Sequence, residues 1–505
     1  MKFHIPIIAL VICSLGRPAI AEPQFISRTE ALHHSHIYTG GWEHFVGGGV
    51  AIFDCNDDSL PDLFVAGGTN PATLLVNISD GDISFTPAEI TQMIAVTGAY
   101  PIDIDSDGIV DLMVLRNGEN QLLRGHGGCT FSDATQDFNL PSDNRWSTAF
   151  SATWEPDRDL PTLAIGNYVD LTDPNGPFGT CDTNWLIRGE GQTYDPPIAL
   201  DPGFCPLSML ISDWQRTHNP MLRISNDRQY YVRDGSEQMW TLVPLRALDA
   251  ADGWPLKQIW GMGIASRDIS GNGMPDVMLT SMGDQVLMRN DGAQFTAVPY
   301  ATGTYAQRPF TGDDGRPSTG WHAEFGDIDN DGLADLFIAK GNVDQMPGLA
   351  MQDPNNLLMQ NADGTFAEAA GIAGIATTDR ARGAGIADLN DDGKLDIVVV
   401  NRRAPLEVWQ NTSPDAGNWI AVDPRQSGVN IYAIGAFIEL RSADGRQTIE
   451  RTIGGGHVSG SLIPLHFGIG KNTEAEIRVI WPDGETTPWE TVTANQTVTI
   501  TRATN

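Results

Sequence analysis

The sequence has little positive charge. Among its 505 residues, 31 Lys and Arg stand against 64 Asp and Glu, and the formal net charge is −33. Such an acidic chain is repelled by nucleic acid and by anionic membranes, so we expect neither as a partner. Apolar residues make up 41% of the chain. That fraction is enough for a buried core, so the acidity indicates cation binding rather than disorder.

Long apolar runs are also missing. One apolar stretch, Ile5–Leu15, follows Lys2 and precedes the small-residue sequence Ala19-Ile20-Ala21. It is too short to span a bilayer, and its parts are those of a cleaved secretory signal over residues 1–21. We find no other apolar run of that kind. The sequence therefore predicts a secreted or periplasmic protein with no membrane span after signal cleavage.

Cysteine is scarce, with five residues in the chain. This excludes a small disulfide-dense scaffold, but an exported protein can still form single bridges. Cys181 and Cys205 bracket an insertion rich in Pro and Gly, so we predict a disulfide between them. Cys55 and Cys129 could pair or remain free, and the sequence alone does not decide between these.

An acidic nine-residue stretch, Asp327 to Asp335, reads Asp-Ile-Asp-Asn-Asp-Gly-Leu-Ala-Asp. Carboxylates occupy positions 1, 3, 5 and 9, and glycine occupies position 6. Alternating hard oxygen donors with a glycine for a sharp turn suit a calcium ion. An EF-hand loop closes with Glu at position 12 and continues into a helix. Here Asp closes the loop at position 9 and an apolar, strand-like run follows, which predicts a calcium loop within a β-hairpin.

Five copies of this stretch predict up to five structural Ca²⁺ sites. Loops 103–111 and 327–335 have four carboxylates, loops 54–62 and 388–396 have three, and loop 268–276 has two, so we expect affinity to fall in that order. The expected ligands are the side chains at positions 1, 3, 5 and 9 and the carbonyl oxygen at position 7. They are Asp54, Asn56, Asp58, Leu60, Asp62; Asp103, Asp105, Asp107, Ile109, Asp111; Asp268, Ser270, Asn272, Met274, Asp276; Asp327, Asp329, Asp331, Leu333, Asp335; and Asp388, Asn390, Asp392, Lys394, Asp396.

The loops recur at a fixed period. Two further units, at Trp154–Thr162 and Asp213–Met221, keep the spacing but have lost the ligands. Seven units of about 56 residues, each with short strands and turn signals, are typical of propeller blades. The seventh unit lacks a fourth strand, which we expect Gln24–Ser27 to supply. We therefore predict an all-β fold with a seven-bladed β-propeller over residues 22–415.

Residues 416–505 have no such period and none of the calcium loops. Several alternating segments read as strands, and Asp444-Gly445 and Asp483-Gly484 are hairpin signals. This part should form a small β-sandwich-like C-terminal domain.

The motifs resemble a known group. The calcium loops look like FG-GAP/VCBS repeats of integrin-α-type propellers. The C-terminal part looks like an ASPIC/UnbV domain, a resemblance carried by Asn418-Trp419-Ile420, Ala433–Ala436, Gly454-Gly455-Gly456, Leu465–Gly470 and Val479–Gly484. The combination is similar to bacterial members of the cartilage acidic protein family, but Gly460 replaces the Gln of a usual Ser-Gln pair. The resemblance implies an exported calcium-binding or adhesion-type protein without established catalysis.

A second group of residues precedes the first strand of several blades, on the face expected to lie opposite the calcium hairpins. Aromatic and guanidinium groups around a channel mouth could bind a glycan, an anion or a peptide. Packing between blades is the alternative, because Trp and Arg are common packing residues. The candidates are Trp42, Trp146, Trp260, Trp321, Arg380 and Arg382.

The sequence thus favours a non-enzymatic, exported, calcium-stabilised scaffold with an unidentified extracellular protein, matrix or glycan ligand. A lectin that uses the Trp/Arg face is the alternative, and a polysaccharide-acting enzyme is a third hypothesis. We find no nucleophile elbow or Cys/His pair that would favour catalysis.

Overall fold

The computed structural model describes residues 22–502 apart from residues 142, 175, 177, 178, 228–234, 256, 306–314 and 345. The expected signal, residues 1–21, lies outside this description. In the described part, no helix is long and apolar enough to cross a membrane. The helices are all short: η1 (Thr29–Leu32), η2 (Trp42–His44), η3 (Ala250–Asp252), η4 (Tyr300–Thr302) and α1 (Ala370–Ala373).

Most strands form four-stranded antiparallel units that follow one another along the chain. Units one to four are β2 (Val50–Phe53), β3 (Asp62–Val65), β4 (Thr73–Asn77), β5 (Phe85–Ala88); β6 (Val96–Ile102), β7 (Asp111–Gly118), β8 (Gln121–Gly125), β9 (Phe131–Asp133); β10 (Arg145–Thr153), β11 (Thr162–Asn167), β12 (Asn184–Ile187), β15 (Ile198–Leu200); and β16 (Pro206–Ser212), β17 (Met221–Asn226), β18 (Gln238–Thr241), β19 (Arg246–Ala247).

The remaining units and a small hairpin complete this part. They are β20 (Gly261–Arg267), β21 (Asp276–Ser281), β22 (Val286–Asn290), β23 (Phe295–Ala297); β24 (Gly320–Gly326), β25 (Asp335–Lys340), β26 (Asn356–Gln360), β27 (Phe366–Glu368); β28 (Ala381–Ala387), β29 (Asp396–Asn401), β30 (Glu407–Asn411), β1 (Phe25–Ser27); and the hairpin β13 (Gly189–Glu190), β14 (Thr193–Tyr194).

The first strands of these units follow one another around a ring. β2 contacts β6, and the contacts continue through β10, β16, β20, β24 and β28, which returns to β2. The N-terminal β1 pairs with β30, with Phe25 opposite Asn411, so the expected completion of the last unit by the N-terminal strand is confirmed. Burial drives this arrangement, because every residue of β6, β16 and β28 is buried between neighbouring units. The expected all-β, propeller-type fold is confirmed.

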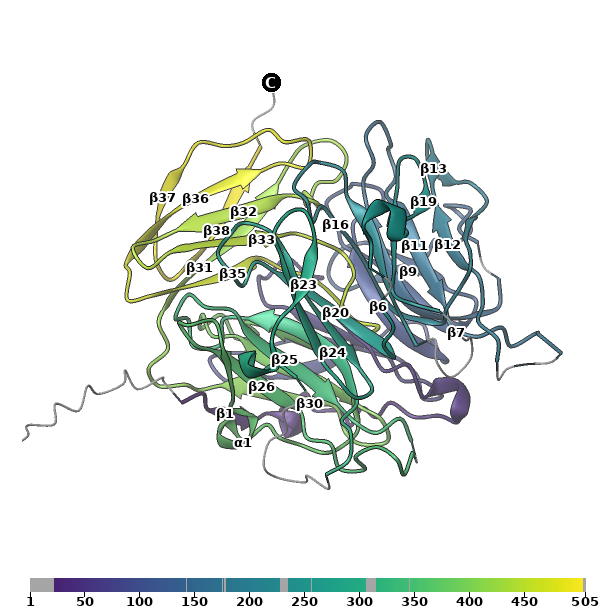
Figure 1. The fold of residues 1–505 in the computed structure, drawn as a ribbon, viewed down its shortest axis with the longest axis horizontal. Coiled ribbons are helices and arrows are strands. Elements are labelled where there is room, and N and C mark those ends of the chain that lie inside the picture. The colour runs from purple at the N-terminus through teal and green to yellow at the C-terminus, as the bar shows by residue number, and fades with distance from the viewer. Residues whose placement is uncertain are drawn as a thin grey trace, which may run out of the picture.

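The C-terminal part forms two further sheets beside the propeller, coloured yellow in Figure 1. Their buried core includes Ile420, Ile438, Phe467, Val479 and Trp481. One sheet has the order β35–β31–β38 and the other β33–β32–β36–β37. The strands are β31 (Asn418–Arg425), β32 (Phe437–Arg441), β33 (Arg446–Glu450), β35 (Leu465–Gly470), β36 (Glu474–Ile480), β37 (Glu490–Thr493) and β38 (Gln496–Thr501).

One C-terminal segment enters the centre of the propeller, which the sequence did not indicate. We call residues 453–462 the axial segment. Its end, β34 (Gly460–Leu462), pairs in parallel with β2, and single bridges link it to first strands of other units. The close approach needs glycine on the propeller side, because a Cβ on Gly98 would lie 2.0 Å from the carbonyl oxygen of Val458. The ring is thus built around a piece of the C-terminal part.

Candidate calcium sites beneath the C-terminal domain

The acidic loops share one backbone conformation, which turns their carboxylates inward. In loop 327–335, Asp327 accepts the N–H of Asp331 at 3.0 Å with Oδ1 and the N–H of Gly332 at 2.8 Å with Oδ2. Positions 4 and 6 are left-handed, with φ of 58° at Asn330 and 94° at Gly332. Glycine at position 6 adopts this conformation without strain. Loop 54–62 has Ser59 there instead, with φ of 72°.

The aspartate at position 9 is a buried structural anchor as well as a candidate ligand. Oδ2 of Asp335 accepts the N–H of Ile328 at 2.9 Å, and Oδ1 accepts the N–H of Gln360 at 2.8 Å. Both bonds have equivalents in every acidic loop. The other anchors are Asp62, Asp111, Asp276 and Asp396. Each oxygen retains a further lone pair for a metal ion.

Position 3 holds oxygen atoms that lack a hydrogen-bond donor. Oδ1 of Asp105, of Asp329 and of Asn390 is buried and has no hydrogen-bond partner. Leaving a buried acceptor unsatisfied costs about 1–3 kcal/mol. Carboxylate oxygens of positions 1, 3 and 9 also lie within 4.8 Å of one another in loops 103–111 and 327–335. A hard cation would satisfy these oxygens and neutralise the clustered charge, so the donor set fits calcium.

In loops 54–62 and 268–276, position 3 is already satisfied. Oδ1 of Asn56 accepts the N–H of Asp58 at 3.3 Å, and the hydroxyl of Ser270 donates to Oδ1 of Asp268 at 3.4 Å. These two loops therefore offer a poorer metal site than the other three. At position 7, each N–H donates to the residue at position 5, while the predicted role of its carbonyl stays a prediction; these residues are Leu60, Ile109, Met274, Leu333 and Lys394.

Burial makes these carboxyl groups hard to ionise without a metal. It raises the pKa of Asp111 to about 8, with Asp105 and Asp103 adding to the effect. It likewise raises the pKa of Asp62 to about 7 and that of Asp329 to about 7. Protons would therefore compete with calcium near neutral pH.

The two loops without ligands are held by side-chain ion pairs instead. In the unit of Trp154–Thr162, Glu155 accepts the hydroxyl of Thr162 at 2.6 Å and pairs with Arg188 at 2.6 Å. In the unit of Asp213–Met221, Arg216 pairs with Glu439 of the C-terminal domain at 2.8 Å. Arginine ion pairs thus hold these two loops.

The C-terminal domain lies on the face that carries the loops. His466 Nε2 is 2.7 Å from Oδ1 of Asn330, and Gly470 donates to the carbonyl of Asn330 at 2.7 Å. The hydroxyl of Tyr432 donates to the carbonyl of Gly108 at 3.1 Å. The candidate calcium sites in loops 103–111 and 327–335 therefore lie at the interface between the propeller and the C-terminal domain.

Amide side chains link neighbouring units by hydrogen bonds that the sequence analysis missed. Asn411 donates to the carbonyl of Ile328, in the loop of the preceding unit, at 2.9 Å. An amide at the end of four of the third strands, β4, β22, β26 and β30, was the available signal. The equivalents are Asn77 to Leu389, Asn290 to Trp214 and Gln360 to Ile269.

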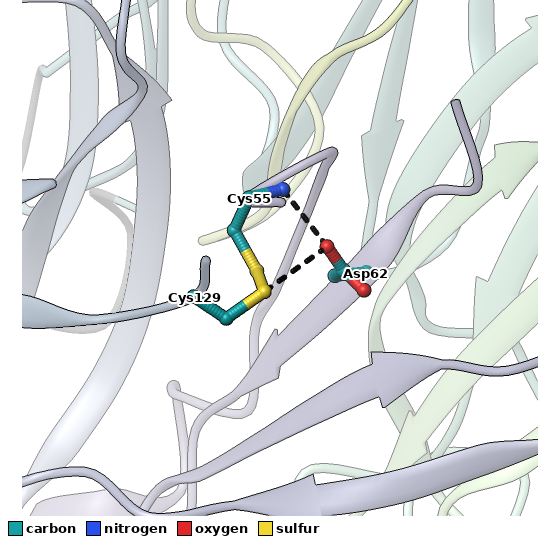
Figure 2. A group of neighbouring side chains, drawn as sticks. All are labelled: Cys55, Asp62 and Cys129. Atoms are coloured by element: carbon teal, nitrogen blue, oxygen red, sulfur yellow. Dashed lines mark hydrogen bonds between the residues drawn. A yellow bond between two sulfur atoms is a disulfide. The ribbon is translucent and has the colours of Figure 1, made fainter. Parts of the chain in front are cut away.

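Both pairs of cysteines form disulfides. The predicted bridge Cys181–Cys205 is confirmed, and Cys55 pairs with Cys129. Figure 2 shows the second bridge beside Asp62, whose Oδ2 accepts the N–H of Cys55 at 2.8 Å. Because both sulfurs are bonded to each other, they are not available as thiolate ligands for a metal. The disulfide instead links loop 54–62 covalently to the next unit.

The predicted Trp/Arg group gathers as expected but is largely inaccessible. Trp146, Trp321 and Arg382 are fully buried. Arg382 donates to the carbonyl of Phe45 at 2.8 Å and stacks 4.1 Å from the ring centroid of Trp321. The ligand role predicted for these three is therefore wrong in this structure, because their side chains are packed against neighbouring residues and have no surface exposed to a ligand. Trp42, Trp260 and Arg380 are partly exposed, and their ligand role stays a prediction.

We expect Glu450 to make the stability of the domain interface depend on pH. It accepts the N–H of Asp213 at 2.8 Å and the hydroxyl of Ser212, and burial raises its pKa to about 8. Because the folded pKa is raised, its contribution to stability is present at acid pH and is lost as the pH rises towards 8. Glu450→Gln should therefore gain stability over the wild type between pH 5 and 8, by roughly 1 kcal/mol per pH unit.

Urea unfolding of both proteins at pH 5, 6.5 and 8 measures this difference. Glu474→Gln, at an exposed position, is the control and should show no such trend. A difference between Glu450→Gln and wild type that is constant with pH would contradict the interpretation.

Comparisons with known proteins follow the same division of the chain. Residues 54–114 and 268–338 match the FG-GAP-like repeat model, and residues 426–505 match the ASPIC and UnbV model. Cartilage acidic protein 1 of Mus musculus is 24% identical over 477 residues, which cover 86% of this chain and 70% of the mouse protein. The Homo sapiens protein is 30% identical over 118 residues, which cover 22% of this chain and 18% of the human protein.

A solved structure of BBS1N in complex with ARL6DN has a TM-score of 0.46 and 8% sequence identity, and the match covers 77% of this chain and 97% of that one. The chain contains FG-GAP-like repeats and an ASPIC and UnbV domain, and it is homologous to cartilage acidic protein 1 over most of its length.

Proposed function

We propose that the protein is an exported, calcium-binding β-propeller that acts as a non-enzymatic scaffold for an extracellular ligand. The buried position-3 oxygens without a hydrogen-bond donor, at Asp105, Asp329 and Asn390, carry the calcium part of the proposal. They recur at one position of three loops, which a chance packing defect would not do.

Export and binding have separate support. The two disulfides fit an oxidising compartment, as does the predicted signal at residues 1–21. Calcium would act as a structural element, because the acidic sites recur around the ring rather than converging on one reactive centre. Adhesion to a protein, matrix or glycan ligand fits the resemblance to FG-GAP-like repeats.

Calcium titration calorimetry on the mature, metal-stripped protein tests this function. We expect three tighter sites, from loops 103–111, 327–335 and 388–396, and weaker binding at loops 54–62 and 268–276. Asp329→Ala should remove one tight site. Asp159→Ala, an exposed acid in a loop without ligands, should remove none. Absence of calcium binding in the wild type would reject the proposed function.

A further inference from the structure

A cavity of about 240 Å³ lies between the propeller and the C-terminal domain. First strands β20, β24 and β28 line one side, and the axial segment with β31 lines the other. We call it the interdomain chamber. The exposed residues Ser59, Asp391 and Thr497 also line it, so the chamber reaches the surface beside loops 54–62 and 388–396. Its volume suits a ligand smaller than a typical drug molecule.

Arg267 is a buried cation in the chamber wall whose neighbouring carboxylates, Asp268, Asp327 and Asp335, act on it through charge without a close ion pair. It is 8% exposed and lines the chamber as well as two adjoining cavities. Among the described residues, its side chain makes one hydrogen bond, a long one of 3.4 Å to the carbonyl of His466. A guanidinium carries five N–H donors, so most of its hydrogen-bonding capacity is unused.

Glu324 supplies an acceptor in the same chamber. His322 Nδ1 accepts the N–H of His457 at 3.0 Å, so in neutral His322 the proton is on Nε2, which faces Oε2 of Glu324 at 3.4 Å. Oε2 also accepts the N–H of Ile386 at 3.1 Å. Within the described residues, Oε1 has no hydrogen-bond partner. It is therefore free to accept a hydroxyl group from a ligand.

We infer that the interdomain chamber binds a small hydroxylated carboxylate, with Arg267 holding the carboxylate and Glu324 accepting a hydroxyl. One unpaired guanidinium matches a monoanion, and its planar fork matches a carboxylate in a bidentate pair. Apolar lining residues, including Ile52, Leu210 and Phe325, suit a short carbon skeleton, and the charged residues Asp388, Asp391, Glu450 and Arg451 also line the chamber.

Calcium should strengthen this site, and this element alone rests on the proposed function. Asp268, Asp327 and Asp335 provide the negative charge that Arg267 feels. They are also candidate ligands of loops 268–276 and 327–335. Calcium bound in these loops would add positive charge beside the buried guanidinium, so an anionic ligand should bind more tightly when calcium is present. By linkage, the anion should raise the calcium affinity of these loops by the same factor.

Titration calorimetry of D-glucuronate into the calcium-loaded full-length mature protein tests the site. D-glucose, which lacks the carboxylate, and inorganic phosphate are the comparison probes. Glucuronate should bind at least 10-fold more tightly than either, because a charged hydrogen-bond pair is lost with glucose. Arg267→Gln should weaken glucuronate binding by at least 10-fold. Arg289→Gln, which lines the adjoining groove but not the chamber, is the matched control and should leave binding unchanged.

The outcomes separate the two proposals. Normal calcium binding without glucuronate binding would overturn the chamber ligand and leave the calcium function standing. Equal binding of glucose, tighter binding of phosphate, or equal losses in the two arginine variants would each overturn the assignment. The comparison of glucuronate, glucose and phosphate needs no variant, so it tests the proposed chamber ligand even if Arg267→Gln fails to fold. Glucuronate binding that is the same in chelator would overturn the calcium dependence.

Discussion

Removing calcium should lower the melting temperature of the protein by about 8 °C. An ion that binds only the folded state stabilises it by about 2.7 kcal/mol per site at a hundredfold excess over Kd, or about 8 kcal/mol for three independent sites. The entropy of unfolding is about 2.1 cal/mol/K per residue, so about 1 kcal/mol corresponds to 1 °C for a chain of this length. Calorimetry with and without chelator measures the shift. Magnesium should restore much less, because it demands near-ideal octahedral geometry.

Substitutions at position 3 of the acidic loops test whether these loops cause the calcium-dependent shift in melting temperature. Asp329→Ala should reduce the effect of calcium by about a third. In chelator it should melt no lower than the wild type, because it removes a buried oxygen without a donor. Combining it with Asp105→Ala and Asn390→Ala should leave little calcium dependence. Asp159→Ala is the control and should keep the full shift. A chelator effect of at most about 1 °C in the wild type would show that these loops do not stabilise the fold through calcium.

Local sequence patterns predicted the parts of the structure that are determined by residues close together in the sequence. Alternation of apolar residues, the turn glycines and the fixed period predicted the strand units and their acidic loops, since each loop conformation is set within nine residues. The completion of the last unit by β1 was also predictable, because β30 would otherwise leave an open edge. The disulfide Cys181–Cys205 followed from its short insertion.

Charge counting ranked the loops imperfectly. It placed loops 54–62 and 388–396 together, with three carboxylates each. In the structure, Oδ1 of Asn56 accepts the N–H of Asp58 at 3.3 Å, while Oδ1 of Asn390 has no donor. The difference depends on which way an amide group turns, which the sequence does not contain. For the same reason, the sequence could not show that the side chains of Trp321 and Arg382 pack against each other.

The placement of the C-terminal domain could not be predicted from local patterns either. β34 pairs with β2, where Gly460 lies opposite Ala51. These two residues are separated by most of the chain. The run Gly454-Gly455-Gly456 was visible as part of a family motif. Its physical purpose, close passage through the ring, becomes clear only from the bridges to Leu210 and Ile264.

Blocking that passage should destabilise the whole protein. In Gly98→Ala, the new Cβ would meet the carbonyl oxygen of Val458 at 2.0 Å and the Cβ of Val458 at 2.6 Å. A backbone oxygen cannot swing aside, so the axial segment must shift. Overpacking of this kind costs about 1–3 kcal/mol. We expect a matching loss in the free energy of unfolding by urea and faster proteolysis within residues 453–462.

The control is Gly348→Ala, where a Cβ meets no atom within 4 Å. It should change the free energy of unfolding by less than about 0.5 kcal/mol. Gly49→Ala should repeat the effect of Gly98→Ala, because its Cβ would lie 1.7 Å from the same oxygen of Val458. If Gly98→Ala and Gly49→Ala both unfold like the wild type and the axial segment stays protected from proteolysis, the stability of the ring does not depend on that segment. The propeller would then be stable without the C-terminal chain at its centre.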